Sequence, residues 1–341
     1  MSKIRVAFNG MGRIGKNVMR VILSKLDDKF DIVAGNDLVP AADIAKSLPR
    51  DSIYGKFPVE VSLKSENVIQ VGRHEITVYA EKDAANIPWS KHDVDIVFEC
   101  TGFYLTTEKA SAHLKGGAKK VIISAPAKDD THTVVVGVNH DSIEAGETIV
   151  SNASCTTNCL APLTKAIDMS YTILGGLMST THAATSTQRV VDFFGGAKHR
   201  ATLNNVIPTT TGAAIAVGKV LPHLNGKLNG TALRVPVDTG SVVEVIYLIE
   251  GEVTVDQISV SITENVKKIN DSTLLKQTVT FGDDYEVSQD CVGEPWSSMI
   301  IPKILTVPVG GNTLVKCTSF YDNEMGFSHR MAELAMIFAA K

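Results

Sequence analysis

Short apolar runs alternate with helical patterns in the first part of the chain. The apolar runs predict strands at Ile4–Asn9, Asp31–Asn36, Asp95–Cys100, Lys120–Ser124, Thr133–Val138 and Thr148–Ser151. Amphipathic patterns between them predict helices at Ile14–Leu26 and Thr106–Gly116. Apolar strands that alternate with helices are typical of a parallel sheet covered on both faces. We therefore expect an α/β domain built on a parallel sheet.

The pattern changes after about Ser154. Longer, β-branched runs with partial alternation predict strands at Thr231–Val237, Ser241–Glu250 and Thr313–Phe320. Helical patterns occupy Thr156–Met169 and Val255–Ile269. Together these elements predict a second, α+β domain with a mainly antiparallel sheet and helices on one side. A last helix, about Ser328–Ala340, follows this domain, and its pattern is compatible with packing on either one.

The composition favours two domains in a reducing compartment. The 341 residues are 44% hydrophobic and 21% charged, which is enough for each domain to bury a core. The net charge of −4 gives no reason to expect nucleic acid or an anionic membrane as the main partner. The five cysteines are odd in number and irregularly spaced, so we expect free thiols. The N-terminus lacks an apolar signal core and the tail Met331–Ala340 is too short to span a membrane, so a cytoplasmic location is expected.

A glycine motif directly follows the first predicted strand. Gly10, Gly12 and Gly15 form the pattern G-x-G-x-x-G at the start of the helix that contains Arg13 and Ile14. The first glycine permits a tight turn, the second lets a pyrophosphate approach the backbone, and the third allows close packing. The helix N-terminus then offers N–H groups to the phosphates. Alone the pattern is weak, because such a turn is often purely structural.

Asp37 strengthens the interpretation of that motif. It ends the next predicted strand, 22 residues beyond Gly15. A carboxylate at this position accepts the ribose hydroxyls of NAD and repels the extra phosphate of NADP. The alternative, a solvated acid at a strand end, is the less favoured one given the combined pattern. The sequence therefore predicts a Rossmann-type domain that binds NAD.

The stretch Ser151–Cys159 carries the candidate chemistry. Small polar residues lead into a helical pattern, so Cys155 lies near a helix start, where the thiolate is favoured. His182 follows an apolar run, Ile173–Met178, and a strand end at that point brings its imidazole within reach of Cys155. The two residues would then form a nucleophile and base pair.

Two other interpretations of these residues stay open at this level. Cys155 is equally compatible with a buried apolar role and His182 with a hydrogen-bonded structural one. A zinc site formed by Cys155, Cys159 and His182 is less favoured, because C-x₃-C lacks the usual C-x₂-C pair and no further ligand cluster is evident. We therefore expect no metal.

At these residues the chain resembles the glyceraldehyde-3-phosphate dehydrogenase family. The resemblance is nearly full length, and the Ser-Cys-Thr-Thr-Asn core is close to diagnostic. It rests on motifs at Phe8–Gly15, Ser151–Asn158, Thr181–Ala183, Pro208–Ala214, Leu233–Pro236 and Tyr321–Glu324. It implies phosphorylating oxidation of glyceraldehyde 3-phosphate with NAD and inorganic phosphate, in glycolysis or gluconeogenesis.

The resemblance also implies the roles of individual residues. Cys155 attacks the aldehyde carbon, His182 is the general base, and phosphate releases the resulting thioester as an acyl phosphate. Thr185 and Arg234 match positions that hold the substrate's phosphate, and Arg200 matches a position shared nearby. The attacking phosphate is assigned to Ser154, Thr211 and Gly212, and Thr156 belongs to the same phosphate-binding set.

On the cofactor side, the resemblance implies that Asn323 holds the nicotinamide carboxamide. Arg13 and Ile14 match contacts of the glycine loop, and Thr101 and Ser124 match positions that line the cofactor cleft. The family returns its C-terminal helix to the cofactor domain. This gives an NAD-binding domain of residues 1–153 and 324–341, a catalytic domain of residues 154–323, and a homotetramer.

The loop after His182 departs from the family pattern. Ala184 and Thr187 stand where tyrosine and aspartate are common, and the stretch 193–200 is about two residues short. A rival substrate is erythrose 4-phosphate, but that branch departs at Pro-Thr-Thr-Thr-Gly, which is intact here. A third hypothesis is a weakly active binding protein, against which the complete set of Cys155, His182, Asn323 and Arg234 argues.

Overall fold

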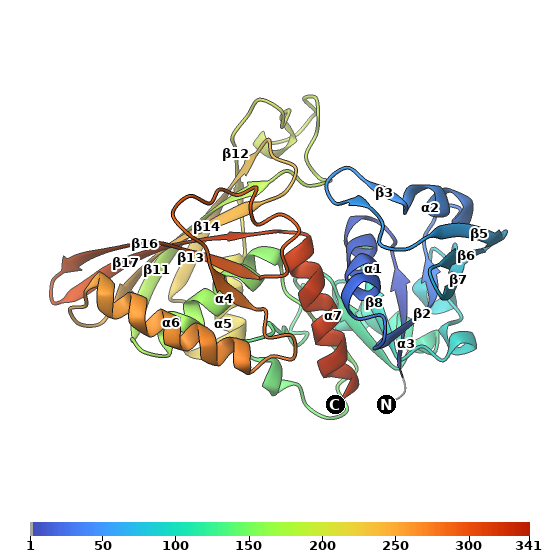
Figure 1. Ribbon diagram of the computed structural model, residues 1–341, viewed down its shortest axis with the longest axis horizontal. Helices are drawn as coiled ribbons and strands as arrows, with labels where there is room; N and C mark the ends of the chain where they lie inside the picture. Colours follow the sequence, from blue (N-terminus) through green and yellow to red (C-terminus); the bar gives the residue numbers. More distant parts are fainter. Residues whose placement is uncertain (1–2) are drawn as a thin grey trace. The chain divides into compact units, whose positions relative to one another are not determined.

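The computed structural model describes residues 3–341, which divide into two compact units. Unit 1 comprises residues up to 134, residues 140–153 and residues 328–341, and unit 2 comprises residues 135–139 and 154–327. The predicted bounds placed residues 135–139 and 324–327 in the first domain, whereas in the structure these residues belong to unit 2. Both units are drawn in Figure 1.

Unit 1 is built on an eight-stranded sheet with the strand order β10-β9-β8-β1-β2-β7-β6-β5. Its strands are β1 (Ile4–Asn9), β2 (Phe30–Asn36), β5 (Val61–Ser65), β6 (Val68–Val71), β7 (His74–Tyr79), β8 (Ile96–Glu99), β9 (Lys120–Ile123) and β10 (Ile149–Ser151), with β3 (Arg50–Asp51) and β4 (Gly55–Lys56) as a separate ribbon. Its helices are α1 (Arg13–Lys25), α2 (Ala41–Ser47) and α3 (Thr107–Lys115), with short 3₁₀ turns at Ala84–Asn86, Trp89–His92 and His140–Ser142.

The sequence predicted the parallel part of this sheet well. Strands β10, β9, β8, β1, β2 and β7 pair in parallel, and the apolar residues of β1 and β8 are largely buried. The predicted strand Thr133–Val138 is wrong. Only Thr133 forms a bridge, to Ser151, and the chain then turns through Gly137, whose φ is +87°. Val134–Val136 are nevertheless buried, so the apolar run marks burial and not strand geometry.

Unit 2 contains a seven-stranded sheet with the strand order β12-β13-β11-β14-β17-β16-β15. The strands are β11 (Ile173–Ala183), β12 (Ile207–Thr210), β13 (Leu228–Val235), β14 (Ser241–Ile249), β15 (Val279–Phe281), β16 (Ser298–Val309) and β17 (Asn312–Tyr321). The helices are α4 (Cys155–Asp168), α5 (Ala213–Val220) and α6 (Val255–Asp271), with 3₁₀ turns at Ala197–His199 and Pro222–Leu224. Most strand pairs are antiparallel, as predicted for an α+β domain.

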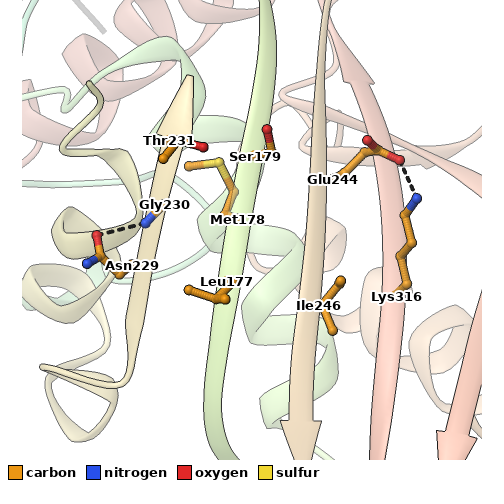
Figure 2. A pocket seen from close by; sticks show the side chains of 9 residues that line it. All are labelled: Leu177, Met178, Ser179, Asn229, Gly230, Thr231, Glu244, Ile246 and Lys316. Carbon is orange, nitrogen blue, oxygen red and sulfur yellow. Dashed lines mark hydrogen bonds and ion pairs between the residues drawn. The ribbon is translucent and has the colours of Figure 1, made fainter. Parts of the chain in front are cut away.

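The two faces of this second sheet differ in exposure. Along β14, Val243, Val245 and Tyr247 are buried, whereas Ile246 between them is 42% exposed. Leu177 of β11 pairs in register with Ile246 and is 68% exposed. Figure 2 shows Leu177 and Ile246 on neighbouring strands, beside the ion pair of Lys316 with Glu244. The sheet therefore carries helices on one face and leaves apolar side chains open on the other.

The last helix, α7 (Met325–Ala339), ends within unit 1. From Ser328 onward it belongs to that unit, where the Lys120 ammonium donates to the carbonyl of Phe338 at 2.6 Å. Arg330 and Glu333, one turn apart, form a fully buried ion pair at 3.1 Å. The expectation that the C-terminal helix returns to the first domain is confirmed, and so is the predicted fold class.

Candidate functional site

The glycine loop of unit 1 has the geometry that a bound dinucleotide requires. Gly10 has a φ of +90°, and a Cβ on it would lie 3.0 Å from the backbone of Cys100 and Thr101. A Cβ on Gly15 would lie 2.2 Å from the Gly10 carbonyl, so both positions require glycine. At Gly12 a Cβ would meet no atom within 4 Å, so the backbone there is open to an approaching phosphate.

Helix α1 begins at Arg13 directly after this opening. It has no side-chain N-cap bond and no acidic residue in its first turn, so no side chain of the helix itself occupies these N–H groups. Ile14 and Gly15 complete the first turn. The guanidinium of Arg13 is held by Asp51 at 2.5 Å.

Asp37 lies at the carboxyl end of β2, beside the loop. Its two oxygens accept from the backbone N–H groups of Met11 at 2.8 Å and Val39 at 3.1 Å. Each carboxylate oxygen has a second lone pair, which fits a diol such as the ribose of NAD. A cavity of about 370 Å³ is lined here by Asn9, Gly10, Gly12, Asn36, Asp37, Leu38, Glu81, Lys82, Cys100, Thr101, Phe103 and Tyr104. These residues fit a dinucleotide.

Thr101 and Ser124, also expected to line the cleft, follow the ends of β8 and β9. The N–H of Thr101 donates to Glu99 at 2.7 Å, and its hydroxyl donates to the same carboxylate oxygen. The N–H of Ser124 donates to the carbonyl of Glu99 at 3.0 Å. Ser124 also bonds to the thiol of Cys100.

In unit 2, Cys155 and His182 are brought together. Cys155 is the first residue of α4, and the hydroxyl of Ser154 caps this helix by accepting from the N–H of Thr157 at 3.0 Å. His182 lies near the end of β11, and its Nε2 is 3.4 Å from the sulfur of Cys155. This is the contact that sequence reasoning left open.

Arg234 completes the cluster because β11 and β13 run parallel with His182 opposite Arg234. One guanidinium nitrogen lies 2.6 Å from Nδ1 of His182 and 3.1 Å from the carbonyl of Ala183. The same Nδ1 lies 2.8 Å from that carbonyl. A guanidinium only donates, so when Arg234 bonds to Nδ1 the ring proton lies on Nε2, toward the sulfur. When Arg234 turns to another acceptor, the ring proton can lie on Nδ1 instead and donate to the carbonyl of Ala183. Nε2 then has a free lone pair and can act as a base.

Burial dominates the protonation of this pair. It raises the pKa of the Cys155 thiol above its ordinary value, against the opposing effects of a Thr156 hydrogen bond and the charge of Arg234. Burial, and then Arg234, lowers the pKa of His182 from 6.5 to about 4. Burial therefore favours the neutral thiol and the neutral imidazole over their charged forms, in opposition to the effect of the helix start.

A chain of hydroxyl groups lies beneath the pair. Thr180 donates to the carbonyl of Val242 at 2.9 Å, and the Tyr321 hydroxyl lies 3.1 Å from Thr180 and 2.9 Å from Thr156. The ring of Tyr321 meets the imidazole of His182 edge to face, with centroids 6.0 Å apart. Tyr321 was not predicted as a site residue, because only the fold brings its hydroxyl group, at the end of β17, within reach of Thr156 on α4 and Thr180 on β11.

The side-chain amide of Asn323 has a fixed orientation. Its oxygen accepts from the hydroxyl groups of Ser241 at 2.8 Å and Thr239 at 3.2 Å, so its NH₂ group faces the other way and is available as a donor. The same Ser241 hydroxyl accepts from the N–H of Ala183 at 3.0 Å, which links Asn323 to the strand of His182. Ser241 also lacked any sequence signal.

The remaining predicted anion residues lie in three places. Thr211 and Gly212 precede α5, with Gly212 as its N-cap and the Thr211 hydroxyl accepting from Ala213 at 3.2 Å. Thr185 is engaged in a turn with Gln188 at 2.8 Å. Arg200 is 64% exposed and pairs with Asp192 of its own loop at 3.2 Å. Within residues 3–341, Arg200 makes no hydrogen bond to Cys155, His182 or Arg234.

Residues 3–341 offer no site for a metal ion, since no group of three or more His, Cys, Asp or Glu side chains in this range is arranged to hold one. No helix in the same part of the chain has the length and apolar character needed to cross a membrane.

Comparison with known proteins gives one family for the whole chain. A profile described as glyceraldehyde 3-phosphate dehydrogenase, NAD binding domain, matches residues 4–107, and one described as glyceraldehyde 3-phosphate dehydrogenase, C-terminal domain, matches residues 154–323. Glyceraldehyde-3-phosphate dehydrogenase of Streptomyces coelicolor is 44% identical over 336 residues, 98% of each chain. The enzyme of Geobacillus stearothermophilus is 43% identical over 341 residues, 99% of each chain. That of Bacteroides fragilis is 44% identical over 344 residues, covering 99% of this chain and 100% of its own.

Proposed function

This chain belongs to the glyceraldehyde-3-phosphate dehydrogenase family and is an NAD-dependent oxidoreductase, and from that premise we propose that it oxidises D-glyceraldehyde 3-phosphate to 1,3-bisphosphoglycerate with inorganic phosphate. The reaction belongs to glycolysis or gluconeogenesis. The observation that carries the proposal is the 3.4 Å approach of the Cys155 sulfur to the His182 ring, with Arg234 bonded to the far side of that ring. A binding protein without turnover needs no such pair.

The covalent step follows from the protonation of the pair. As the Cys155 sulfur adds to the aldehyde carbon, its proton passes to Nε2 of His182. The imidazolium then transfers this proton to the substrate oxygen, which becomes a hydroxyl, while the N–H of Cys155 at the start of α4 donates a hydrogen bond to the same oxygen. NAD, when bound, accepts the hydride of the reacting carbon. His182 takes the hydroxyl proton in that step, which leaves an acyl thioester on Cys155.

Inorganic phosphate completes the cycle by attacking the thioester carbonyl. The C–S bond breaks, the acyl group leaves as a mixed anhydride, and the sulfur recovers its proton from His182. Ser154, Thr156, Thr211 and Gly212 are proposed to bind the attacking phosphate through hydroxyl and N–H groups. Thr185, Arg234 and Arg200 are proposed for the phosphate of the substrate, for which Arg200 would have to leave Asp192.

Arg234 gives substrate binding a direct effect on the base. An anion that draws Arg234 away from Nδ1 allows Nδ1–H to donate to the Ala183 carbonyl, at 2.8 Å. Nε2 then has the free lone pair that a general base needs. On the cofactor side, Asp37, the glycine loop with Arg13 and Ile14, Thr101 and Ser124 are proposed to hold NAD, and the oriented NH₂ group of Asn323 is proposed to bind the carboxamide oxygen.

NADH formation tests the proposal. Wild type should form NADH from glyceraldehyde 3-phosphate only when inorganic phosphate is present, as followed by absorbance. Cys155→Ser should lower turnover by at least about a thousandfold, because a neutral hydroxyl is a far weaker nucleophile. The matched control is Cys159→Ser, a buried thiol one turn further along α4, which should retain turnover.

The other hypotheses are distinguished by the same assay. Turnover that survives Cys155→Ser would reject the thioester route. Faster NADH formation from erythrose 4-phosphate would replace the proposed substrate, and no turnover with either sugar phosphate would leave a binding protein.

We also propose that the chain forms a homotetramer. Two apolar surfaces in unit 2 support this. One is the open face of the sheet, centred on Leu177 and Ile246. The other is the segment 190–206, whose exposed side chains include Val190, Val191, Phe194, Leu203 and Val206. Two self-complementary surfaces generate a closed tetramer with two-fold axes. All five cysteines are free thiols, which supports the proposed cytoplasmic setting.

A further inference from the structure

Glu99, the last residue of β8, has a carboxylate buried beneath the cavity at the glycine loop. Its side chain is 0% exposed. One oxygen accepts from the Asn9 amide at 2.6 Å and from Nε2 of His113 at 3.0 Å. The other accepts from the N–H of Thr101 at 2.7 Å and from the Thr101 hydroxyl. Four donors therefore converge on one carboxylate, and all of them lie in unit 1.

The direction of every hydrogen bond in this network is fixed. The N–H of Glu81 donates to the oxygen of the Asn36 amide at 2.8 Å, so the nitrogen of that amide donates to the oxygen of Asn9, also at 2.8 Å. The nitrogen of Asn9 must then donate to Glu99. On the other side, Nδ1 of His113 accepts from the Trp89 indole at 3.2 Å, so its Nε2 carries the proton.

A chain of donors that all point one way must end on a group that only accepts. An ionised carboxylate is such a group and has two accepting oxygens, whereas an amide or a protonated acid presents a hydrogen. The four donors stabilise that charge against the cost of its burial. Glu99 is thus required as a carboxylate, and not only as a polar residue.

The network leads directly to the surface that faces the cavity. Asn9, Asn36 and Thr101 all line the cavity, whereas Glu99 does not. The Thr101 hydroxyl also accepts from the N–H of Phe103 at 3.2 Å, which shapes the loop after β8. Gly10 lies so close to Thr101 that the glycine loop depends on the position of that residue.

We propose that Glu99 is a positioning residue for NAD: its buried carboxylate holds Asn9 and Thr101 so that the glycine loop and the cavity have the dinucleotide-binding shape before NAD arrives. The inference rests on the proposed location of NAD at this cavity. Glu99 acts through its neighbours and touches no reacting atom.

Glu99→Gln tests this most sharply, because it preserves size and shape. An amide offers one oxygen and one NH₂ group, so whichever way it is oriented, NH₂ meets either the two donors of Thr101 or those of Asn9 and His113. One side of the network must therefore move. We expect the dissociation constant of NAD, measured by titration calorimetry, to rise by about tenfold or more.

The matched control is Glu333→Gln. Glu333 is an equally buried carboxylate of unit 1, bonded to Arg330 and absent from the lining of the cavity. Both variants are expected to lower the melting temperature of the NAD-free protein, but only Glu99→Gln should weaken NAD binding. Alkylation of Cys155 by iodoacetamide without NAD should proceed at the wild-type rate in both, which shows that unit 2 is intact.

Thr101 supplies a second test that leaves Glu99 in place. Thr101→Val loses the hydroxyl donor to Glu99 and should weaken NAD binding more than Thr101→Ser, which keeps both donors. In turnover assays the effect of Glu99→Gln should appear in the KM for NAD and not in kcat.

The inference is overturned if Glu99→Gln binds NAD as wild type does, or if Glu333→Gln weakens binding equally. It is also overturned if Thr101→Val and Thr101→Ser bind alike. In each of these cases the proposed function stands, because wild type still binds NAD. Failure of wild type itself to bind NAD would instead reject the proposed function.

Discussion

Burial controls the chemistry of individual residues in the Cys155–His182 pair more than helix position does. A thiol at a helix start is expected to ionise easily, yet removal from water raises the pKa of Cys155 and outweighs the Thr156 hydrogen bond and the charge of Arg234. Burial therefore favours the neutral forms of both groups in the resting pair.

His182→Gln should make stability less sensitive to acid. The pKa of His182 is 6.5 in the unfolded chain and about 4 in the fold, so the unfolded state takes up a proton first as the pH falls. The contribution of this residue is fully present above pH 6.5 and is lost as the pH falls through 4. The loss is about 3 kcal/mol.

Urea unfolding at pH 7 and pH 4 measures the difference. Wild type should lose more unfolding free energy than His182→Gln does over that interval. Equal losses in wild type and His182→Gln would contradict the lowered pKa.

The sequence predicts the site residues that stand in a recognisable motif. It does not predict those whose role depends on hydrogen bonds to residues far away along the chain. Cys155, His182 and Asp37 stand in recognisable patterns. Ser241 and Tyr321 act through hydrogen bonds to residues 58 or more positions away, which no local pattern contains. Glu99 did carry a signal, since an acid inside the apolar run of β8 must be paired when buried.

At the scale of elements, two glycines of the loop are required for different reasons. Gly10 is required by the backbone turn, and Gly12 by the approach of the ligand. Gly10→Ala places a Cβ against the Cys100–Thr101 backbone at a φ of +90°, so it should lower the melting temperature and weaken NAD binding. The strain in the backbone alone is about 1–2 kcal/mol. Gly12→Ala meets no protein atom, so it should leave the melting temperature unchanged and weaken only NAD binding.

Thermal unfolding without NAD and calorimetric titration with NAD check both variants. A Gly12→Ala variant that binds NAD normally would contradict the proposal that the phosphates of NAD bind at this part of the loop. A Gly10→Ala variant with the wild-type melting temperature would show that the turn relaxes.

Strand prediction depended on which strands bury both faces. β1, β2 and β8 lie in the parallel centre, and their continuous apolar runs are easily found. β5, β6 and β7 were not predicted. β7 pairs in parallel with β2 and antiparallel with β6, and β5, at the edge, exposes nearly all its side chains and gives no apolar run. The run at 133–138 shows the converse error, in which burial occurs without a strand.

At the scale of the whole molecule, the open face of the second sheet should govern assembly. Ile246→Lys puts a charge beside Leu177 at the centre of that face, and is expected to split the tetramer into smaller species. The matched control is Val260→Lys on α6, an equally apolar exposed residue away from the strands of that face.

Sedimentation velocity checks the prediction. Wild type and Val260→Lys should sediment as tetramers and Ile246→Lys more slowly. A monomeric wild type would reject the proposed assembly. A tetrameric Ile246→Lys variant would show that the interface lies on another surface.

The membership of residues 328–341 in unit 1 has a consequence for biosynthesis. This unit is completed by a segment that leaves the ribosome only after the whole of unit 2 has been translated. Until then α7 is absent, so Lys120 of β9 lacks the carbonyl of Phe338 to which it donates. The apolar residues that α7 contacts in unit 1 also stay uncovered. The nascent dinucleotide-binding unit therefore reaches its final stability only after α7 has been translated, and this interval is when chaperones have most to protect.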